Sequence, residues 1–341
     1  MNWKIKGNMK IISVLAIMLA IVGCRATQEN GRGLSDAGET GIVSLGVKFE
    51  KSQTKSMTDY TEVQKEETMI NKVCFMVFDS ETGLLNSLKV VAGGEKGCSM
   101  SVPVGEKVIY AIVNGPYPGG VRKISDIDDL EDMLSEEGMG MVGLTAIGKT
   151  VCMVGPGTVN DEKTIVVRWL ASRVVLSGVT CNIPQQHGGM TIDCVFLGNV
   201  NTKQRFGGGV SCLVNENGLS GGKPVGKDGV MGDFSSYLYR KVDDLVNVGD
   251  TMTDKYHMYC QPDDGEIPTC LYLLVTISGV QYYYRVPLTG GLKPNMTCSV
   301  ELKITNLGST TPPDGDAQKG EIQAVVSFDD WQPGNYYVEE F

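Results

Sequence analysis

Short runs in which apolar and polar residues alternate recur along the whole chain and limit the folds that it can adopt. Clear examples lie over residues 43–49, 298–304 and 322–328. A period of two places successive side chains on opposite faces of a strand, so each run predicts a half-buried β-strand. Glycine, asparagine, aspartate and proline separate the runs, and long stretches with a helical period are absent. The pattern predicts an all-β protein.

The beginning of the chain has the pattern of a bacterial lipoprotein leader. A basic start precedes an apolar stretch, residues 11–23, that is shorter than the roughly 20 residues a membrane-spanning helix needs. We expect residues 1–23 to be a signal peptide, cleaved between Gly23 and Cys24, with acyl chains on Cys24. An ordinary signal peptide with a chance cysteine is the alternative. The lysines and the lipobox are Lys4, Lys6, Lys10 and Ile21-Val22-Gly23-Cys24.

The charge of the mature chain excludes several classes of partner. Removing the leader leaves 27 of the 30 basic residues against 40 acidic ones. Nucleic acid and anionic lipid surfaces both require a basic face, so we expect neither to bind through charge. The length after cleavage is sufficient for two domains.

Cysteine and histidine usage argues against a metal centre. The chain has ten cysteines but no C-x-x-C pair, and it has two histidines, His187 and His257. A zinc site is therefore not expected. With Cys24 acylated, nine cysteines remain, so at least one thiol stays free. Small buried hydrophobic residues are the favoured interpretation, and the disulfide pairing stays open.

The sequence contains no convincing motif for catalysis or cofactor binding. Gly138, Gly140 and Gly143 match G-x-G-x-x-G, but a helix precedes them and a strand-like run follows, which is the reverse of a dinucleotide fingerprint. We find no nucleophile elbow or recognisable catalytic triad. We therefore expect neither an enzyme nor a cofactor, with a carboxylate-pair hydrolase left open.

The spacing of the runs gives the order of segments. Residues 24–40 form a polar tether, and a first strand follows over 43–49. One short helix is predicted to begin at Ser125, with an acidic residue three positions later as in a capping box. A long strand over 163–179 is expected to bridge two domains. Further strands are predicted over 72–78, 86–92, 99–103, 107–113, 141–146, 150–154 and 190–197, and a strongly apolar run covers 271–288.

Four segments of the mature chain occur in a recognisable order. They are residues 39–49 with Lys55-Ser56, residues 106–114, residues 139–143 leading to Val166-Val-Arg168-Trp-Leu-Ala171-Ser-Arg173-Val174, and residues 292–331. No single one of these motifs is specific. In this order behind a lipobox, they resemble the fimbrillin family of Bacteroidales lipoprotein pilins, the subunits of type V pili, over essentially the whole mature chain.

The resemblance implies a fold, a function and partners. The fold would be two β-sandwich domains of transthyretin-like, Greek-key topology, the first over residues 41–168 and the second over 169–341, with the one short helix in the first. The function would be that of a structural subunit of a surface pilus that supports cell adhesion. The partners would be other copies of the chain, related pilins and a processing protease. The acylated precursor would sit in the cell outer membrane, and the polymer would form an extracellular fimbrium.

The resemblance also implies assembly by strand exchange. A protease would remove the first strand with its processing region, residues 41–55, and so open an apolar groove for a neighbouring subunit. The inward residues of that strand are Val43, Leu45, Val47 and Phe49. The processing site of the family follows an arginine, whereas Lys55-Ser56 occupies the matching position here. Either the protease accepts lysine, or this chain is an uncut anchor or tip subunit.

The C-terminal end is the expected donor strand. Trp331 follows the run at 322–328, and the tail after it continues as an apolar, β-prone segment. A donor strand needs alternate side chains that fill the pockets of a neighbour. The alternative is that residues 321–331 are the last strand of their own sheet and that the tail frays. The expected donor residues are Trp331, Tyr336, Tyr337, Val338 and Phe341.

Two further hypotheses come from local composition. A glycan-binding surface lipoprotein would need an exposed aromatic platform, for which Trp169, Trp331 and the tyrosines at 282–284 are the candidates. Asp250-Thr251-Met252 resembles a short acceptor sequence of periplasmic O-glycosylation, so Thr251 is a candidate modification site.

Overall fold

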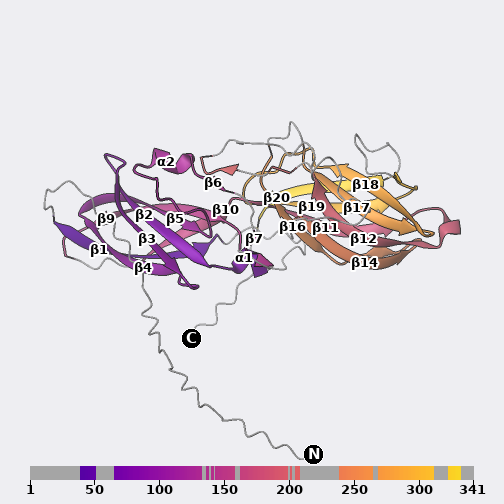
Figure 1. Ribbon diagram of the computed structural model, residues 1–341, viewed down its shortest axis with the longest axis horizontal. Coiled ribbons are helices and arrows are strands. Elements are labelled where there is room, and N and C mark those ends of the chain that lie inside the picture. Colours follow the sequence, from indigo (N-terminus) through magenta and orange to yellow (C-terminus); the bar gives the residue numbers. More distant parts are fainter. Residues whose placement is uncertain are drawn as a thin grey trace, which may run out of the picture.

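Two β-sandwiches placed end to end make up the described part of the chain (Figure 1). The computed structural model describes residues 39–50, 65–132, 136–137, 140–141, 143–157, 162–198, 200–201, 204–207, 238–263, 268–310 and 322–331. Most of these residues lie in strands and very few in helices, so the predicted all-β sandwich fold is confirmed. In these residues, no helix is long and apolar enough to cross a membrane.

Seven strands form the first sandwich, in the hydrogen-bonded order β3-β2-β5-β9-β10-β1-β4. β10 pairs with β9 only over its last two residues, where Arg168 lies opposite Ile147 and Trp169 opposite Ala146. The path therefore folds into two layers, β3-β2-β5-β9 and β10-β1-β4, that are joined at one corner. The strands are β1 (Thr40–Phe49), β2 (Lys72–Asp79), β3 (Leu85–Ala92), β4 (Gly97–Pro103), β5 (Gly105–Val113), β9 (Ala146–Val154) and β10 (Lys163–Trp169).

The two layers of the first sandwich share one core. Val43 and Leu45 of β1, Phe75 of β2 and Ile165 of β10 are each at most 1% exposed and belong to one buried cluster. In β1 and β10 these residues are the inward members of alternating runs, whereas β2 is apolar and buried on both faces. Burial of this apolar surface is the main force that holds β1 in place.

The second sandwich packs the sheet β14-β12-β17-β18 on the sheet β15-β11-β19-β20, in which β16 also pairs with β11. Its core includes Val174, Ile192, Leu273 and Val300, all fully buried. The strands are β11 (Ser172–Cys181), β12 (Gly189–Gly198), β14 (Tyr239–Asn247), β15 (Thr251–Met252), β16 (Tyr256–Cys260), β17 (Cys270–Ile277), β18 (Val280–Pro287), β19 (Met296–Ile304) and β20 (Ile322–Asp330).

The last strand, β20, lies at the edge of its sheet. It pairs antiparallel with β19 along its whole length and ends the strand order of the described sheet. Its side chains are half-buried or exposed, and Val325 is 68% exposed. β20 is therefore the most weakly buried long strand that faces the core of the second sandwich.

The prediction of one long strand over 163–179 is wrong. The segment forms two strands, β10 and β11, that belong to different sandwiches. Leu170 and Ala171 separate them, because the Leu170 N–H donates to the Thr145 carbonyl at 2.9 Å and the Ala171 carbonyl accepts from the Asn295 N–H at 3.1 Å. Neither backbone group is free to continue a ladder at this corner.

The predicted helix is shorter than expected, and its capping is different. α2 (Ser125–Asp128) has four residues, and Ile124, not Ser125, occupies its N-cap without a side-chain cap. Asp126 instead accepts hydrogen bonds from the preceding Arg122 and Lys123 N–H groups. A second four-residue helix precedes β2, so the first sandwich has more than the one helix expected. The remaining short elements are α1 (Lys65–Thr68), β6 (Glu131–Asp132), β7 (Glu136–Glu137), β8 (Gly140–Met141), η1 (Gln185–His187) and β13 (Gln204–Arg205).

The cysteines that the structure describes form no disulfide with one another and, except for half-buried Cys98, are buried. Burial raises the pKa of the Cys74, Cys194 and Cys298 thiols to about 12, so they stay protonated. Such thiols behave as small hydrophobic side chains. Cys24 and Cys212 lie outside the described residues.

Candidate functional site

The first strand, β1, lies inside its layer rather than at an edge. It pairs in parallel with β10 over residues 45–49 and antiparallel with β4 over residues 40–46. Figure 1 shows it in indigo in the first sandwich. Loss of β1 would leave two strands with unpaired backbone groups and an open slot between them. We call this slot, between β4 and β10, the β1 slot.

The floor of the β1 slot is apolar. The side chains of Val43, Leu45 and Val47 are 0%, 1% and 7% exposed and point into the core of the first sandwich. Fully burying one such side chain is worth about 1.5–3 kcal/mol. Any strand that replaces β1 therefore has to supply aliphatic side chains at these three positions.

The slot has a strict requirement at its first inward position. A Cβ built on Gly41 would overlap the carbonyl oxygen of Gly155, and it would also meet a methyl group of Val154 at 2.7 Å. The Gly155 oxygen is a backbone atom and cannot move as a flexible side chain can. Only glycine fits this position without a shift of the neighbouring backbone.

Two contacts fix the other end of β1. The Phe49 ring stacks on Trp169, with the ring centroids 4.8 Å apart and the planes 11° from parallel. The Glu50 carboxylate accepts from Nη2 and Nε of Arg168, both at 2.6 Å, which makes a bidentate ion pair. The hydrogen bond that Arg168 donates to Glu50 raises the pKa of Arg168. The chain then continues into residues 51–64, which lie outside the described part.

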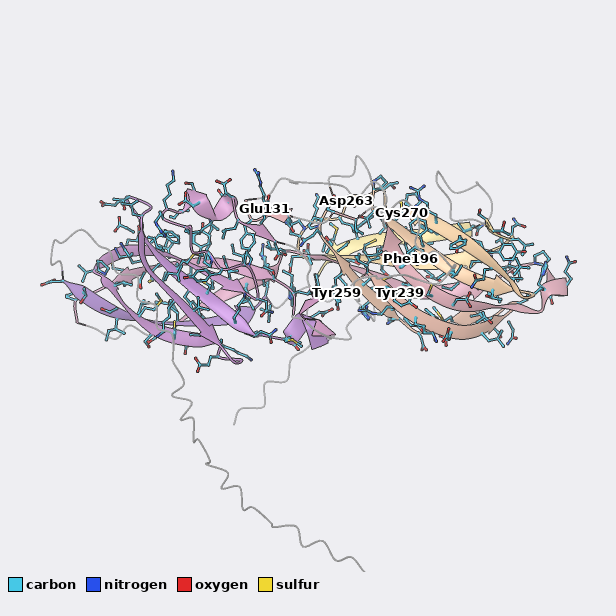
Figure 2. All side chains as sticks on the ribbon, viewed as in Figure 1. Glu131, Phe196, Tyr239, Tyr259, Asp263 and Cys270 are labelled. Atoms are coloured by element: carbon cyan, nitrogen blue, oxygen red, sulfur yellow. The ribbon has the colours of Figure 1, made fainter. Side chains whose placement is uncertain are left out.

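An aromatic stack continues from this end of β1 across the junction of the two sandwiches. Trp169 stacks on Trp331 with centroids 4.6 Å apart, and Trp331 stacks on Tyr259 at 5.5 Å. All three rings are at most 2% exposed. Figure 2 labels Tyr259 at the junction between the two sandwiches. The stack joins the ends of β1 and β10 to β16 and to the residue that follows β20.

A buried ion pair lies beside the stack. Glu67 of α1 is fully buried and accepts from Nη1 of Arg173 at 3.1 and 3.3 Å and from the Tyr259 hydroxyl at 2.8 Å. The Arg173 guanidinium also lies 5.1 Å from the centre of the Trp331 ring. Burial raises the pKa of Glu67, and the charge of Arg173 opposes that rise. The pair ties the segment after residues 51–64 to the second sandwich.

Asn295 locks the same junction through its backbone and its side chain. Its φ of 58° lies in the left-handed region, which asparagine tolerates better than most residues. Its Oδ1 accepts from the Trp169 N–H at 3.3 Å, and its carbonyl accepts from the Trp331 N–H at 2.8 Å. One residue of the second sandwich thus fixes both tryptophans of the stack.

The residues predicted from the sequence fall into two groups. Val43, Leu45, Val47 and Phe49 come together as the inward face of β1. Trp331, expected to fill a pocket of a neighbour, is buried in its own chain instead. The other predicted site residues lie outside the described residues: Gly23, Cys24, Lys55, Ser56, Tyr336, Tyr337, Val338 and Phe341.

Thr251 and the aromatic candidates are also placed by the structure. Thr251 is exposed on β15, and its hydroxyl lies 2.8 Å from that of Thr180 on β11. Tyr283 and Tyr284 are 6% and 2% exposed, so β18 does not present them as an aromatic platform. The described residues contain no group of acidic, histidine or cysteine side chains that could hold a metal ion.

Sequence reasoning missed the residues of the junction. Arg173 stands inside the segment at 166–174 on which the family resemblance partly rests, and this was the one signal that the sequence offered. Glu67 lies in a polar stretch, and nothing in the sequence pairs it with Arg173 or Tyr259.

Comparison with known proteins supports the fold. The chain matches no protein-family model and no curated protein sequence. Among solved structures, it is similar to a fimbrilin from Porphyromonas gingivalis W83, with a TM-score of 0.57 and 16% identity over 86% of this chain and 98% of that chain. It is also similar to a candidate cell adhesion protein from Bacteroides eggerthii, with a TM-score of 0.58 and 17% identity over 89% of this chain and 100% of that one. A third similar structure is a candidate cell adhesion protein from Parabacteroides distasonis, with a TM-score of 0.59 and 16% identity over 88% of this chain and 99% of that one. At these identities, the likeness shows a shared two-sandwich fold along nearly the whole of each chain.

Proposed function

We propose that this chain is a structural subunit of a surface pilus, exported as a lipoprotein and polymerised by strand exchange. A protease cuts within residues 51–64, β1 leaves, and a C-terminal segment of a neighbouring copy takes its place. The role is structural rather than enzymatic. The observation that carries the proposal is β1 itself, a buried strand with hydrogen-bonded neighbours on both sides whose link to the rest of the fold is residues 51–64.

The physics of the β1 slot supports this assembly. While β1 is in place, it covers the apolar floor of the slot and the facing edges of β4 and β10. Once β1 leaves, β4 and β10 present unpaired backbone groups above an apolar floor. Such an edge pairs readily with an extended segment of another chain.

The structural likeness to a Porphyromonas fimbrilin supports the same proposal. The predicted lipobox is consistent with it, because a lipid anchor would hold the uncut precursor at the outer membrane until it is processed. The extracellular product would be the fimbrium, and its adhesive role would follow from its exposure at the cell surface.

Electron microscopy of the bacterial surface tests the proposed function. Deleting the gene should remove or shorten a class of surface filaments, and an antibody against the purified chain should label those filaments along their length in the parent strain. Label confined to the base or the end of each filament would indicate an anchor or tip subunit instead. Unchanged filaments without label would refute the proposal.

Lipidation at Cys24 gives a separate prediction. Cys24→Ala removes the thiol that accepts the lipid, so we expect an unprocessed precursor that does not incorporate labelled palmitate. Cys212→Ala, which leaves the lipobox intact, is the matched control and should label normally. Palmitate labelling of the Cys24 variant would contradict the lipobox assignment.

A glycan-binding function has less support. Trp169 and Trp331 are 1% and 2% exposed and stack on each other, so they offer no free face to a sugar. Among the described aromatic side chains, Tyr117 is 57% exposed, but a single ring on a loop is not a platform.

A further inference from the structure

The junction between the two sandwiches is held together on two sides. On the first, which we call the β6 side, β6 pairs with β13, and the buried Asp132 carboxylate accepts from Nε2 of Gln261 at 2.9 Å. On the second, which we call the stack side, lie the aromatic stack and the Glu67 ion pair. Figure 2 labels Glu131 of β6 on the first side and Tyr259 toward the second. The two sides can therefore respond differently when a segment leaves.

β1 contributes to the stack side and to none of the β6-side contacts described above. Its Phe49 ring stacks on Trp169 at 4.8 Å, and Trp169 stacks on Trp331 of the second sandwich at 4.6 Å. Trp169 is 1% exposed, so the departure of Phe49 would uncover part of its ring. Arg168, the neighbour of Trp169, would lose its Glu50 partner at the same time. Loss of β1 thus takes support from the end of the stack that lies in the first sandwich.

Two hydrogen bonds cross the junction next to this stack. The Trp169 N–H donates to Oδ1 of Asn295 at 3.3 Å, and the Asn295 N–H donates to the Ala171 carbonyl at 3.1 Å. The first bond is longer than the common N–H···O range of about 2.7–3.2 Å, so a small shift of Trp169 is enough to break it. Both amides therefore report whether the stack side is closed.

We infer that the end of β1 braces this junction, and that its departure converts the junction into a hinge that opens on the stack side and stays closed on the β6 side. The inference rests on the proposed removal of β1 and goes beyond it, because it names an effect on the second sandwich. The uncut precursor is one rigid body. The processed subunit bends about Leu170 and Ala171, the residues that carry the chain from β10 to β11. A filament of such subunits bends within each subunit rather than at the contacts between subunits.

The Glu67 ion pair limits how far the stack side opens. Its carboxylate binds Arg173 and Tyr259 of the second sandwich, whereas α1, which carries it, continues into β2 of the first. A cut within residues 51–64 lies before α1, so this pair stays in the processed subunit. One part of the stack side therefore leaves with β1, and the other part remains and keeps the two sandwiches in contact.

Hydrogen exchange of the uncut mature chain, resolved to single amides by mass spectrometry, tests the inference. The Trp169 and Asn295 amides report on the stack side. The Phe206 amide, which donates to the Leu130 carbonyl at 3.0 Å beside β6 and β13, reports on the β6 side. The Val47 amide, which is hydrogen-bonded within the first sandwich, shows whether β1 is seated.

Phe49→Leu removes the ring but keeps an aliphatic side chain. We expect the Trp169 and Asn295 amides of this variant to exchange about fivefold faster, because one stacking contact is lost, while the Phe206 and Val47 amides exchange as in the parent. Phe49→Tyr keeps the ring and should exchange like the parent at all four amides. Val47→Ala is the matched control, because it shortens another inward side chain of β1 without touching the stack, and it should leave the Trp169 amide unchanged.

Three results would overturn the inference. Equal exchange in the Phe49→Leu and Phe49→Tyr variants would mean that stacking on Trp169 does not hold the junction. Acceleration of the Trp169 amide by Val47→Ala as large as by Phe49→Leu would mean that general loosening of β1, and not the stack, is responsible. Equal acceleration of the Phe206 amide would mean that the junction opens on both sides and is not a hinge.

A cut protein separates this inference from the proposed function. A site-specific protease sequence inserted within residues 51–64 is cut after folding, and a synthetic peptide of residues 40–50, or the same peptide with Phe49→Leu, is added in excess. Both peptides should enter the slot and protect β4 and β10, but only the parent peptide should slow the Trp169 amide to its rate in the uncut protein. If both slow it equally, the brace is overturned and strand exchange stands. If neither enters, β1 does not leave and the proposed strand exchange fails, while the uncut variants still decide whether Phe49 braces the junction.

Discussion

Replacing Glu67 by alanine is expected to lower the free energy of unfolding by about 3–5 kcal/mol. The change leaves Arg173 charged, 3% exposed and without its carboxylate partner. It also removes the carboxylate to which the Tyr259 hydroxyl donates a hydrogen bond. Removing one partner of a buried ion pair destabilises a protein more than replacing both partners by apolar residues, because the remaining charge keeps its full desolvation penalty.

Chemical denaturation followed by tryptophan fluorescence measures this effect directly. After removal of the leader, which contains Trp3, the tryptophans of the chain are Trp169 and Trp331, and both belong to the stack beside Glu67. Lys241→Ala, which breaks an ion pair whose lysine side chain is 70% exposed, is the control and should change stability by less than about 1 kcal/mol. Equal, small effects of both changes would mean that the junction does not depend on the buried pair.

Leu45→Ala is expected to destabilise the uncut precursor by about 2–5 kcal/mol. Leu45 is 1% exposed in the centre of β1, so the change leaves a cavity in the core of the first sandwich. The matched control on the same strand is Ile42→Ala, because Ile42 points outward and is 39% exposed. That change should have a much smaller effect.

The same pair of variants distinguishes precursor from polymer. Once β1 has left, residue 45 is absent from the subunit, so filaments of the Leu45→Ala protein should resist heat and denaturant as well as those of the parent. Exchange should also begin sooner, since a weakened β1 leaves more readily. Filaments as destabilised as the precursor would show that β1 stays in place.

The alternating runs predicted most of the strands because alternation is a local property of the sequence. β1, β19 and β20 lie within a few residues of their predicted limits, since each has one face on a core. The corner at Leu170 and Ala171 could not be predicted in this way. The apolar run continues through it, and the break is imposed by hydrogen bonds to Thr145 and Asn295, which are distant in the sequence.

The candidate site shows the same division between local and distant information. The inward face of β1 could be predicted from its period of two. The Glu67 partners could not, because Arg173 and Tyr259 lie 106 and 192 positions away. Trp331 was interpreted as a donor residue because a large aromatic side chain near a chain end suggests an anchor. The stack that buries it becomes visible only when Trp169 and Tyr259 are brought together by the fold.

Mass spectrometry of subunits taken from isolated surface filaments tests the central claim most directly. If β1 is removed before polymerisation, the intact mass and the N-terminal peptide should place the start of every polymerised subunit within residues 51–64, at or near Ser56, and peptides from residues 40–49 should be missing. Subunits that still begin at Cys24 and retain residues 40–49 would contradict strand exchange through the β1 slot.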